Sequence, residues 1–143
     1  MTQRNHPPSR KSNSSRPVLA LLSDDEQLAK MVDTLAVSKW SIIKPGMAKV
    51  ATLIREPNVK LIIFDDECVG VSDRGWALTE IRRCASKASI IYVAGDHDHE
   101  NERQARTRGV LFYTAKPLIP DDVGLLIQRL LQKHDDDGNL ASR

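Results

Sequence analysis

The chain has 143 residues, of which 41% are hydrophobic and 28% are charged, as expected for one soluble globular domain. It contains no run of about eighteen apolar residues and no signal-like apolar segment after Met1, which argues against membrane insertion and secretion. The two cysteines, Cys68 and Cys84, form no metal-binding or redox motif. We therefore expect a cytoplasmic protein that folds without a disulfide or a structural metal.

The basic charge is concentrated at the N-terminus. Residues 1–16 hold four of the 21 basic residues and no acidic one, so 17 basic and 19 acidic residues remain and give the rest of the chain a net charge of −2. A basic arm can bind nucleic acid or anionic lipid, but the Pro, Ser and Asn content here is more typical of a disordered leader. We expect a basic leader at 1–16, a folded domain at 17–133 and a polar tail at 134–143.

Apolar runs and helical spacing alternate along the first part of the folded segment. Residues 17–22 form an apolar run typical of a strand buried on both faces. A helix with one apolar face follows, capped by residues 23–25. Its apolar residues are Leu28, Met31, Val32 and Leu35. A weaker strand is expected at 40–44, and a second helix after it. That helix is marked by Met47, Val50, Ala51 and Ile54.

The same alternation continues to the C-terminal part. Residues 59–64 form the clearest buried strand, and a polar loop at 65–75 leads to a third helix. The inward residues of that helix are Ala77, Leu78 and Ile81. Strands are expected at 89–94 and 110–114, with a short polar helix at 100–108 between them. Pro120 opens a last helix. Its apolar residues are Val123, Leu126, Ile127, Leu130 and Leu131.

Five strands that alternate with five helices through short connections predict a three-layer α/β/α fold around a doubly wound, five-stranded parallel sheet. In such sheets, ligand sites lie beyond the carboxyl ends of the strands. Acidic residues follow the first and third strands at 24–26 and 65–67, and Lys116 follows the fifth. Carboxylates from neighbouring strand ends suit a hard divalent cation such as Mg²⁺, and a lysine there could bind a transferred phosphoryl group.

The chain resembles the receiver domain of bacterial response regulators. The resemblance covers residues 17–133 and is best in the segments VLALLSDDEQL, VKLIIFDDE and GVLFYTAKPLIP. It implies a flavodoxin-like sheet order of 2-1-3-4-5. It also implies a stand-alone signalling domain of a two-component phosphorelay rather than an enzyme. A sensor histidine kinase or another signalling protein would then be the partner, and a homodimer is left open.

The resemblance assigns roles by position. Asp65 is placed as the phosphoacceptor and Lys116 as the lysine that follows the fifth strand, with Mg²⁺ as the cofactor. The implied metal ligands are Asp24, Asp25, Asp65 and Glu67, the last through its backbone carbonyl. The register of the acidic pair is open, because the pair is either Ser23 and Asp24 or Asp24 and Asp25.

Two departures from the family pattern concern the conformational switch. Tyr113 falls at the position of a switching aromatic residue, but Ala94 replaces the usual Thr or Ser at the end of the fourth strand. Alanine has no hydroxyl group to bind the phosphoryl group, and the loop at 68–75 lacks the family proline. The alternative is therefore a pseudo-receiver, a protein-interaction module that works without phosphorylation.

Other functions have weaker support. The segment Gly95-Asp96-His97-Asp98-His99-Glu100 contains metal-ligand residue types and faintly resembles one element of metallophosphoesterases. The other elements of those enzymes are missing, so a metal-dependent phosphohydrolase is the less favoured alternative and we interpret the histidines as solvated. Neither Trp40 nor Trp76 has neighbours that suggest a base-stacking platform, so nucleic acid is not an expected partner of the folded domain.

Overall fold

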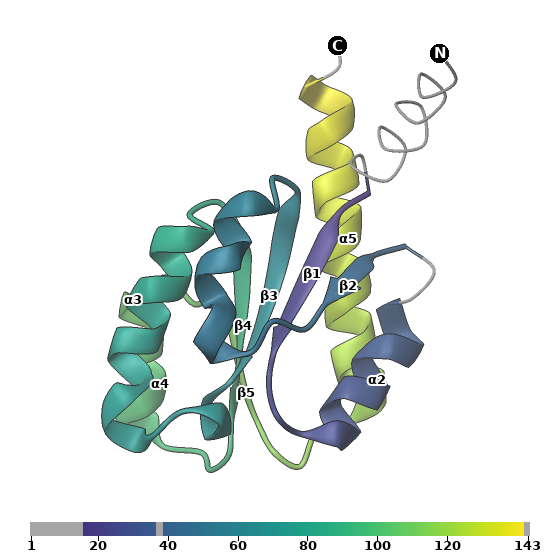
Figure 1. The fold of residues 1–143 in the computed structure, drawn as a ribbon. Helices are drawn as coiled ribbons and strands as arrows, with labels where there is room; N and C mark the ends of the chain where they lie inside the picture. Colours follow the sequence, from purple (N-terminus) through teal and green to yellow (C-terminus); the bar gives the residue numbers. More distant parts are fainter. Residues whose placement is uncertain (1–15, 37–38, 142–143) are drawn as a thin grey trace.

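The computed structural model describes residues 16–36 and 39–141, so most of the leader expected at 1–16 lies outside the described residues. One parallel sheet has the order β2-β1-β3-β4-β5, with helices on both faces (Figure 1). The predicted fold class and strand order are confirmed. The strands are β1 (Val18–Leu22), β2 (Ser41–Ile43), β3 (Val59–Asp65), β4 (Ser89–Ala94) and β5 (Phe112–Ala115).

Two apolar layers separate the sheet from its helices. One face packs against the 3₁₀ segment η2 (Met47–Arg55), α3 (Arg74–Cys84) and α4 (His99–Thr107). The other face packs against α2 (Glu26–Ala36) and α5 (Pro120–Ala141). Six residues of the predicted strands are at most 2% exposed. They are Leu19, Leu21, Ile62, Ile63, Ile91 and Val93. Burial on both faces explains why β1, β3 and β4 are nearly continuous apolar runs.

The second helix differs from the prediction. Residues 47–55 form 3₁₀ turns interrupted at Lys49, whose φ of −119° and ψ of 24° are not helical. A 3₁₀ turn has three residues, so side chains at i and i+3 share a face. Val50 and Leu53 are therefore buried, whereas Ile54, which the α-helical spacing placed inward, is 58% exposed. The inward residues expected for α3 are confirmed as buried.

Two further boundaries differ from the sequence-based expectation. The backbone of α5 continues to Ala141, so residues 134–141, expected as a polar tail, extend the helix. The loop expected at 65–75 contains two 3₁₀ turns, η3 (Asp66–Cys68) and η4 (Val71–Asp73). Among the helices of residues 16–36 and 39–141, none is both long enough and apolar enough to cross a membrane.

Candidate functional site

Asp65 is the last residue of β3, and its carboxylate is 1% exposed. Its Oδ2 accepts hydrogen bonds from Ser23 Oγ at 2.6 Å and from Lys116 Nζ at 2.9 Å. Its Oδ1 accepts one from the backbone N–H of Glu67 at 3.1 Å. Leu22 pairs with Phe64 in the sheet, which places the next residue of each strand side by side. The strand ends thus bring together a buried anion and the donors that satisfy it.

Lys116 follows β5 and connects three carboxylates. Its Nζ lies 2.9 Å from Asp25 Oδ2, 2.9 Å from Asp65 Oδ2 and 2.8 Å from Glu67 Oε1. Burial alone would lower the pKa of Lys116, but the hydrogen bonds to Glu67, Asp25 and Asp65 outweigh it and raise that pKa above its ordinary value. One ammonium group among three carboxylates leaves an excess of negative charge in the pocket.

Asp25 has two structural roles in this group. Its Oδ1 accepts hydrogen bonds from the backbone N–H groups of Gln27 and Leu28, at 2.9 and 3.2 Å, and so caps the start of α2. Its Oδ2 faces Lys116. The hydrogen bond from Lys116, followed by that from the Leu28 backbone, holds the pKa of the Asp25 carboxyl below its usual value. This residue is therefore a charged partner of Lys116 as well as a helix cap.

Asp24 lies at the edge of the group. Its side chain is exposed and makes no hydrogen bond or ion pair within the described part of the chain. Ser23, one residue earlier, is the residue that contacts Asp65. Ser23 and Asp25 therefore contact the group around Asp65, whereas Asp24 does not, and the register of the acidic pair stays open.

Glu67 joins the group through its side chain. Its Oε1 accepts a hydrogen bond from Lys116, and its side chain crosses over Gly95 after β4. A Cβ at Gly95 would lie 2.6 Å from Glu67 Cγ and Cδ, which is closer than real contacts allow. The role expected for the Glu67 carbonyl stays a prediction.

The negative charge of the pocket also acts on Cys68. Burial, followed by the charges of Asp65 and Asp24, raises the pKa of the Cys68 thiol to about 12. Its Sγ lies 3.5 Å from the backbone oxygen of Leu22. The thiol is therefore neutral near pH 7 and is a structural neighbour of the pocket.

A second buried carboxylate, Asp66, was not singled out by the sequence. It is 0% exposed, and its hydrogen bonds form a network separate from the group around Lys116. Its Oδ2 accepts a hydrogen bond from Tyr92 Oη at 2.8 Å, and its Oδ1 accepts one from Gly95 N–H at 2.9 Å. Arg74 Nε lies 3.4 Å from Oδ2. Burial is the largest effect on the Tyr92 hydroxyl and raises its pKa above the usual value. The hydrogen bond from Asn101 lowers this pKa, and the hydrogen bond to Asp66 raises it.

The two residues predicted as switch positions lie beside this network. Ala94 ends β4 and is 0% exposed. Tyr113 is half-buried and stacks on Tyr92 with 5.1 Å between ring centroids. Its hydroxyl accepts a hydrogen bond from Asn101 Nδ2 at 3.2 Å. Tyr113 is thus fixed by β4 and α4, and the alanine offers it no hydroxyl group.

A solvent-accessible approach leads to the Lys116 side of the group. A cavity of about 440 Å³ is lined by Asp25, Gly95, Lys116 and apolar residues of α2 and the loop after β5. Small solutes can therefore reach the ammonium group and the Asp25 carboxylate. The sequence-predicted residues Asp25, Asp65, Glu67 and Lys116 are in mutual contact through the lysine, whereas Asp24 is adjacent and Ala94 carries no polar group.

Known structures share this architecture, although no family model and no curated protein matches the chain. The structure is similar to the signal receiver domain of a LuxO repressor protein from Vibrio parahaemolyticus, with a TM-score of 0.72 and 17% identity over 87% of this chain and 97% of that one. It is also similar to a response regulator from Thermotoga maritima, with a TM-score of 0.70 and 13% identity over 82% and 98%. For a CpaE2 pilus assembly protein from Sinorhizobium meliloti, the TM-score is 0.64 and the sequence identity is 18%, over 78% of this chain and 98% of that one.

At these identities, the similarity shows a shared fold. The chain has the flavodoxin-like fold of response-regulator receiver domains, as its sequence resemblance implied. The same fold also occurs in a protein described by a role in pilus assembly. The function therefore has to be argued from the side chains of this chain.

Proposed function

We propose that this protein is a signal-receiver domain that accepts a phosphoryl group on Asp65 in a Mg²⁺-dependent reaction. The observation that carries the proposal is the contact of Lys116 with Asp65, Asp25 and Glu67 at the carboxyl ends of the strands. A phosphoryl group adds negative charge beside Asp65. A lysine 2.9 Å from the nucleophile is therefore in position to bind it.

The donor set fits a magnesium ion. Carboxylate oxygens are the ligands that Mg²⁺ prefers, and the pocket has more carboxylates than cationic groups. Asp24, Asp25 and Asp65 would hold the ion, together with the Glu67 carbonyl. When bound, the metal would neutralise charge on the incoming phosphoryl oxygens.

The chain's own residues supply the remaining chemistry. One oxygen of the Asp65 carboxylate attacks phosphorus, and the bond to the leaving group breaks with its electron pair on that group. The product is an aspartyl phosphate. Lys116 shifts from the Asp65 carboxylate to the phosphoryl oxygens, while Ser23 remains a hydroxyl donor at the same edge. A sensor histidine kinase or another phosphodonor would supply the phosphoryl group.

A labelling experiment tests the proposal directly. The full chain is incubated with acetyl phosphate and Mg²⁺ and analysed by intact-mass spectrometry. We expect slow addition of one phosphoryl group, lost with EDTA and lost in Asp65→Asn. Asp96→Asn is the matched control, because this exposed carboxylate follows β4 and lies outside the Lys116 group. Labelling that survives Asp65→Asn contradicts the proposal.

Specific contacts favour a second candidate, a pseudo-receiver that binds partner proteins without phosphorylation. Ala94 offers no hydroxyl group, and Tyr113 is already held by Asn101 and stacked on Tyr92. Phosphorylation would then change Tyr113 little. The exposed apolar side chains of β5, the loop after it and α5 include Phe112, Ile119 and Leu125, and they would contribute to binding a signalling partner or a second copy. Absence of labelling, with partner binding unchanged in Asp65→Asn, would support this candidate.

A further inference from the structure

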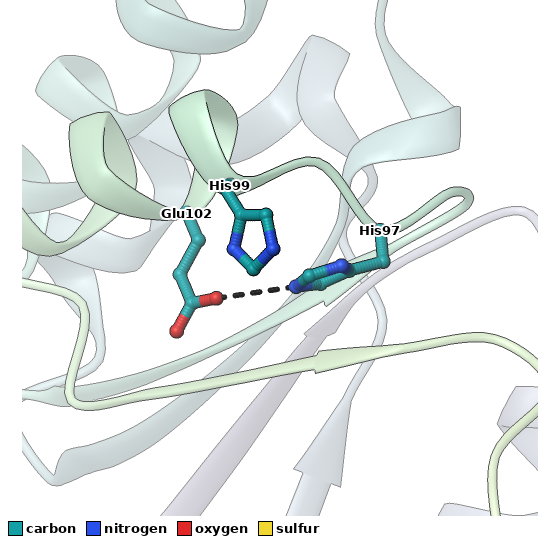
Figure 2. A group of neighbouring side chains, drawn as sticks. All are labelled: His97, His99 and Glu102. Atoms are coloured by element: carbon teal, nitrogen blue, oxygen red, sulfur yellow. Dashed lines mark hydrogen bonds and ion pairs between the residues drawn. The ribbon is translucent and has the colours of Figure 1, made fainter.

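The strongest candidate outside the acidic pocket is the group formed by His97, His99 and Glu102. Each residue offers one ligand atom, and the three atoms lie within 4.8 Å of one another. Figure 2 shows the two imidazole rings and the carboxylate turned toward a common space at the start of α4. We propose that these residues form a transition-metal site with Zn²⁺-type preference.

The local backbone explains why these three side chains meet. Asp98 is the N-cap of α4, and its side chain accepts a hydrogen bond from the Glu100 backbone N–H at 3.0 Å. His99 and Glu102 are three residues apart on the helix, so they share a face. His97 precedes the cap and turns back toward Glu102 (Figure 2). The cap therefore fixes where the loop ends and the helix begins.

One ligand-atom distance already suits tetrahedral coordination, and all three ligand atoms lie within 4.8 Å of one another. Zinc binds histidine nitrogen at about 2.0–2.1 Å and carboxylate oxygen at about 2.0–2.2 Å, so tetrahedral ligand atoms lie about 3.3–3.5 Å apart. His97 Nε2 and Glu102 Oε1 are already 3.3 Å apart. The His97 and His99 rings have centroids 4.6 Å apart and an interplanar angle of 84°. Small rotations of the two exposed histidine side chains bring the remaining atoms into range.

The Glu102 carboxylate presents one of its two oxygens to the proposed metal position. Arg106 binds Glu102 Oε2 at 2.9–3.0 Å, which leaves Oε1 directed toward His97. Arg106 orients the ligand as outer partners of metal sites do, although its positive charge opposes the metal.

The ligand types select the metal class. Two imidazoles and one carboxylate suit Zn²⁺, Ni²⁺, Co²⁺ or Cu²⁺ better than Mg²⁺, which prefers oxygen ligands. Three protein ligands leave a fourth position for water or for a side chain of another protein. His97 also contacts the Tyr113 ring edge-on, with centroids 6.1 Å apart. Metal binding would therefore fix the loop after β4 beside Tyr113.

Titration of the full chain with ZnCl₂, followed by calorimetry and NMR, tests this site. We expect one ion per chain, with the largest chemical-shift changes at residues 97–102 and smaller ones at Tyr113. His97→Ala and His99→Ala should each weaken binding by at least about tenfold. The other two histidines provide matched controls, and His6→Ala and His134→Ala should leave the affinity unchanged.

Further variants separate this site from the acidic pocket. Asp65→Asn should retain Zn²⁺ binding, and Co²⁺ substitution should give the intense visible absorption of a tetrahedral site. The two histidine side chains are exposed, so their variants are expected to keep the wild-type circular dichroism spectrum and melting temperature. Binding that persists in the His97→Ala/His99→Ala double variant, or that is lost in Asp65→Asn, would overturn the proposal.

Discussion

Replacing Asp66 by alanine should destabilise the fold more than the conservative change Asp65→Asn at the neighbouring residue. The Asp66 carboxylate is fully buried and accepts hydrogen bonds from Tyr92 and Gly95. Hydrogen bonds to a charged group contribute about 1.5–3 kcal/mol each. Without Asp66, the Gly95 N–H would lose its acceptor, and the Tyr92 hydroxyl would keep only Asn101 as a partner. Arg74 would also lose its carboxylate, but its side chain is 23% exposed and can turn toward water.

These contributions give an expected loss of about 3–5 kcal/mol in the free energy of unfolding, the range found when one partner of a buried ion pair is removed. Asp66→Asn should cost about 1–3 kcal/mol, because its amide oxygen can keep one of the two hydrogen bonds. Asp65→Asn is the matched control, with an expected change of about 1 kcal/mol or less. The amide oxygen of this variant can still accept hydrogen bonds from Ser23 and Lys116. The substitution also removes one of the three carboxylates that repel one another around Lys116.

Equilibrium urea unfolding monitored by circular dichroism measures these differences, provided that the dependence on urea concentration is unchanged. A loss below about 1 kcal/mol in Asp66→Ala would refute the view that Asp66 anchors a buried network. So would a larger loss in Asp65→Asn than in Asp66→Ala. The same pair of variants also tests the assignment of the phosphoacceptor, since labelling should depend chemically on Asp65 alone.

Three further predictions concern charge, packing and reactivity. The folded-state pKa of Asp25 lies below its unfolded value, so its stabilisation is present above about pH 4 and is lost as the pH falls through the folded value. The stability difference between wild type and Lys116→Met should therefore shrink in urea unfolding below about pH 4; a constant difference would contradict the pairing. Ile127→Ala should cost about 2–5 kcal/mol, because this side chain is 1% exposed, and the half-buried Leu126→Ala should cost less in the same assay. Native Cys68 should react slowly with iodoacetamide at pH 8, because its thiol is half-buried and its pKa is about 12; rapid labelling followed by peptide mass mapping would contradict this.

The sheet could be predicted from the sequence because its strands are buried on both faces. The runs at 17–22 and 59–64 contain almost no polar residue, and such runs have few alternatives to an interior strand. The segment at 47–55 was harder, because apolar residues there match α-helical and 3₁₀ spacing at several positions. Packing of Val50 and Leu53 on the sheet selects the tighter turns.

The candidate site was predictable in location and less so in its contacts. The rule that sites lie at the carboxyl ends of parallel strands correctly brought Asp65 and Lys116 together. The rule does not predict that the neighbouring acid, Asp66, points away from the group around Lys116. Successive side chains of an extended chain point to opposite sides, and this alternation could have separated Asp66 from the group around Asp65. The hydrogen bond from Ser23 to Asp65 was not predicted either. The sequence analysis treated Ser23 only as a possible member of the acidic pair.

The contact between Glu67 and Gly95 links two positions that are distant in sequence. The Glu67 side chain reaches Lys116 across the space that a Cβ at Gly95 would fill. A larger residue at 95 would thus demand a shorter side chain at 67 or one that turns away from the lysine. Among homologous sequences, the two positions should therefore covary, with glycine at 95 accompanying a long acidic residue at 67.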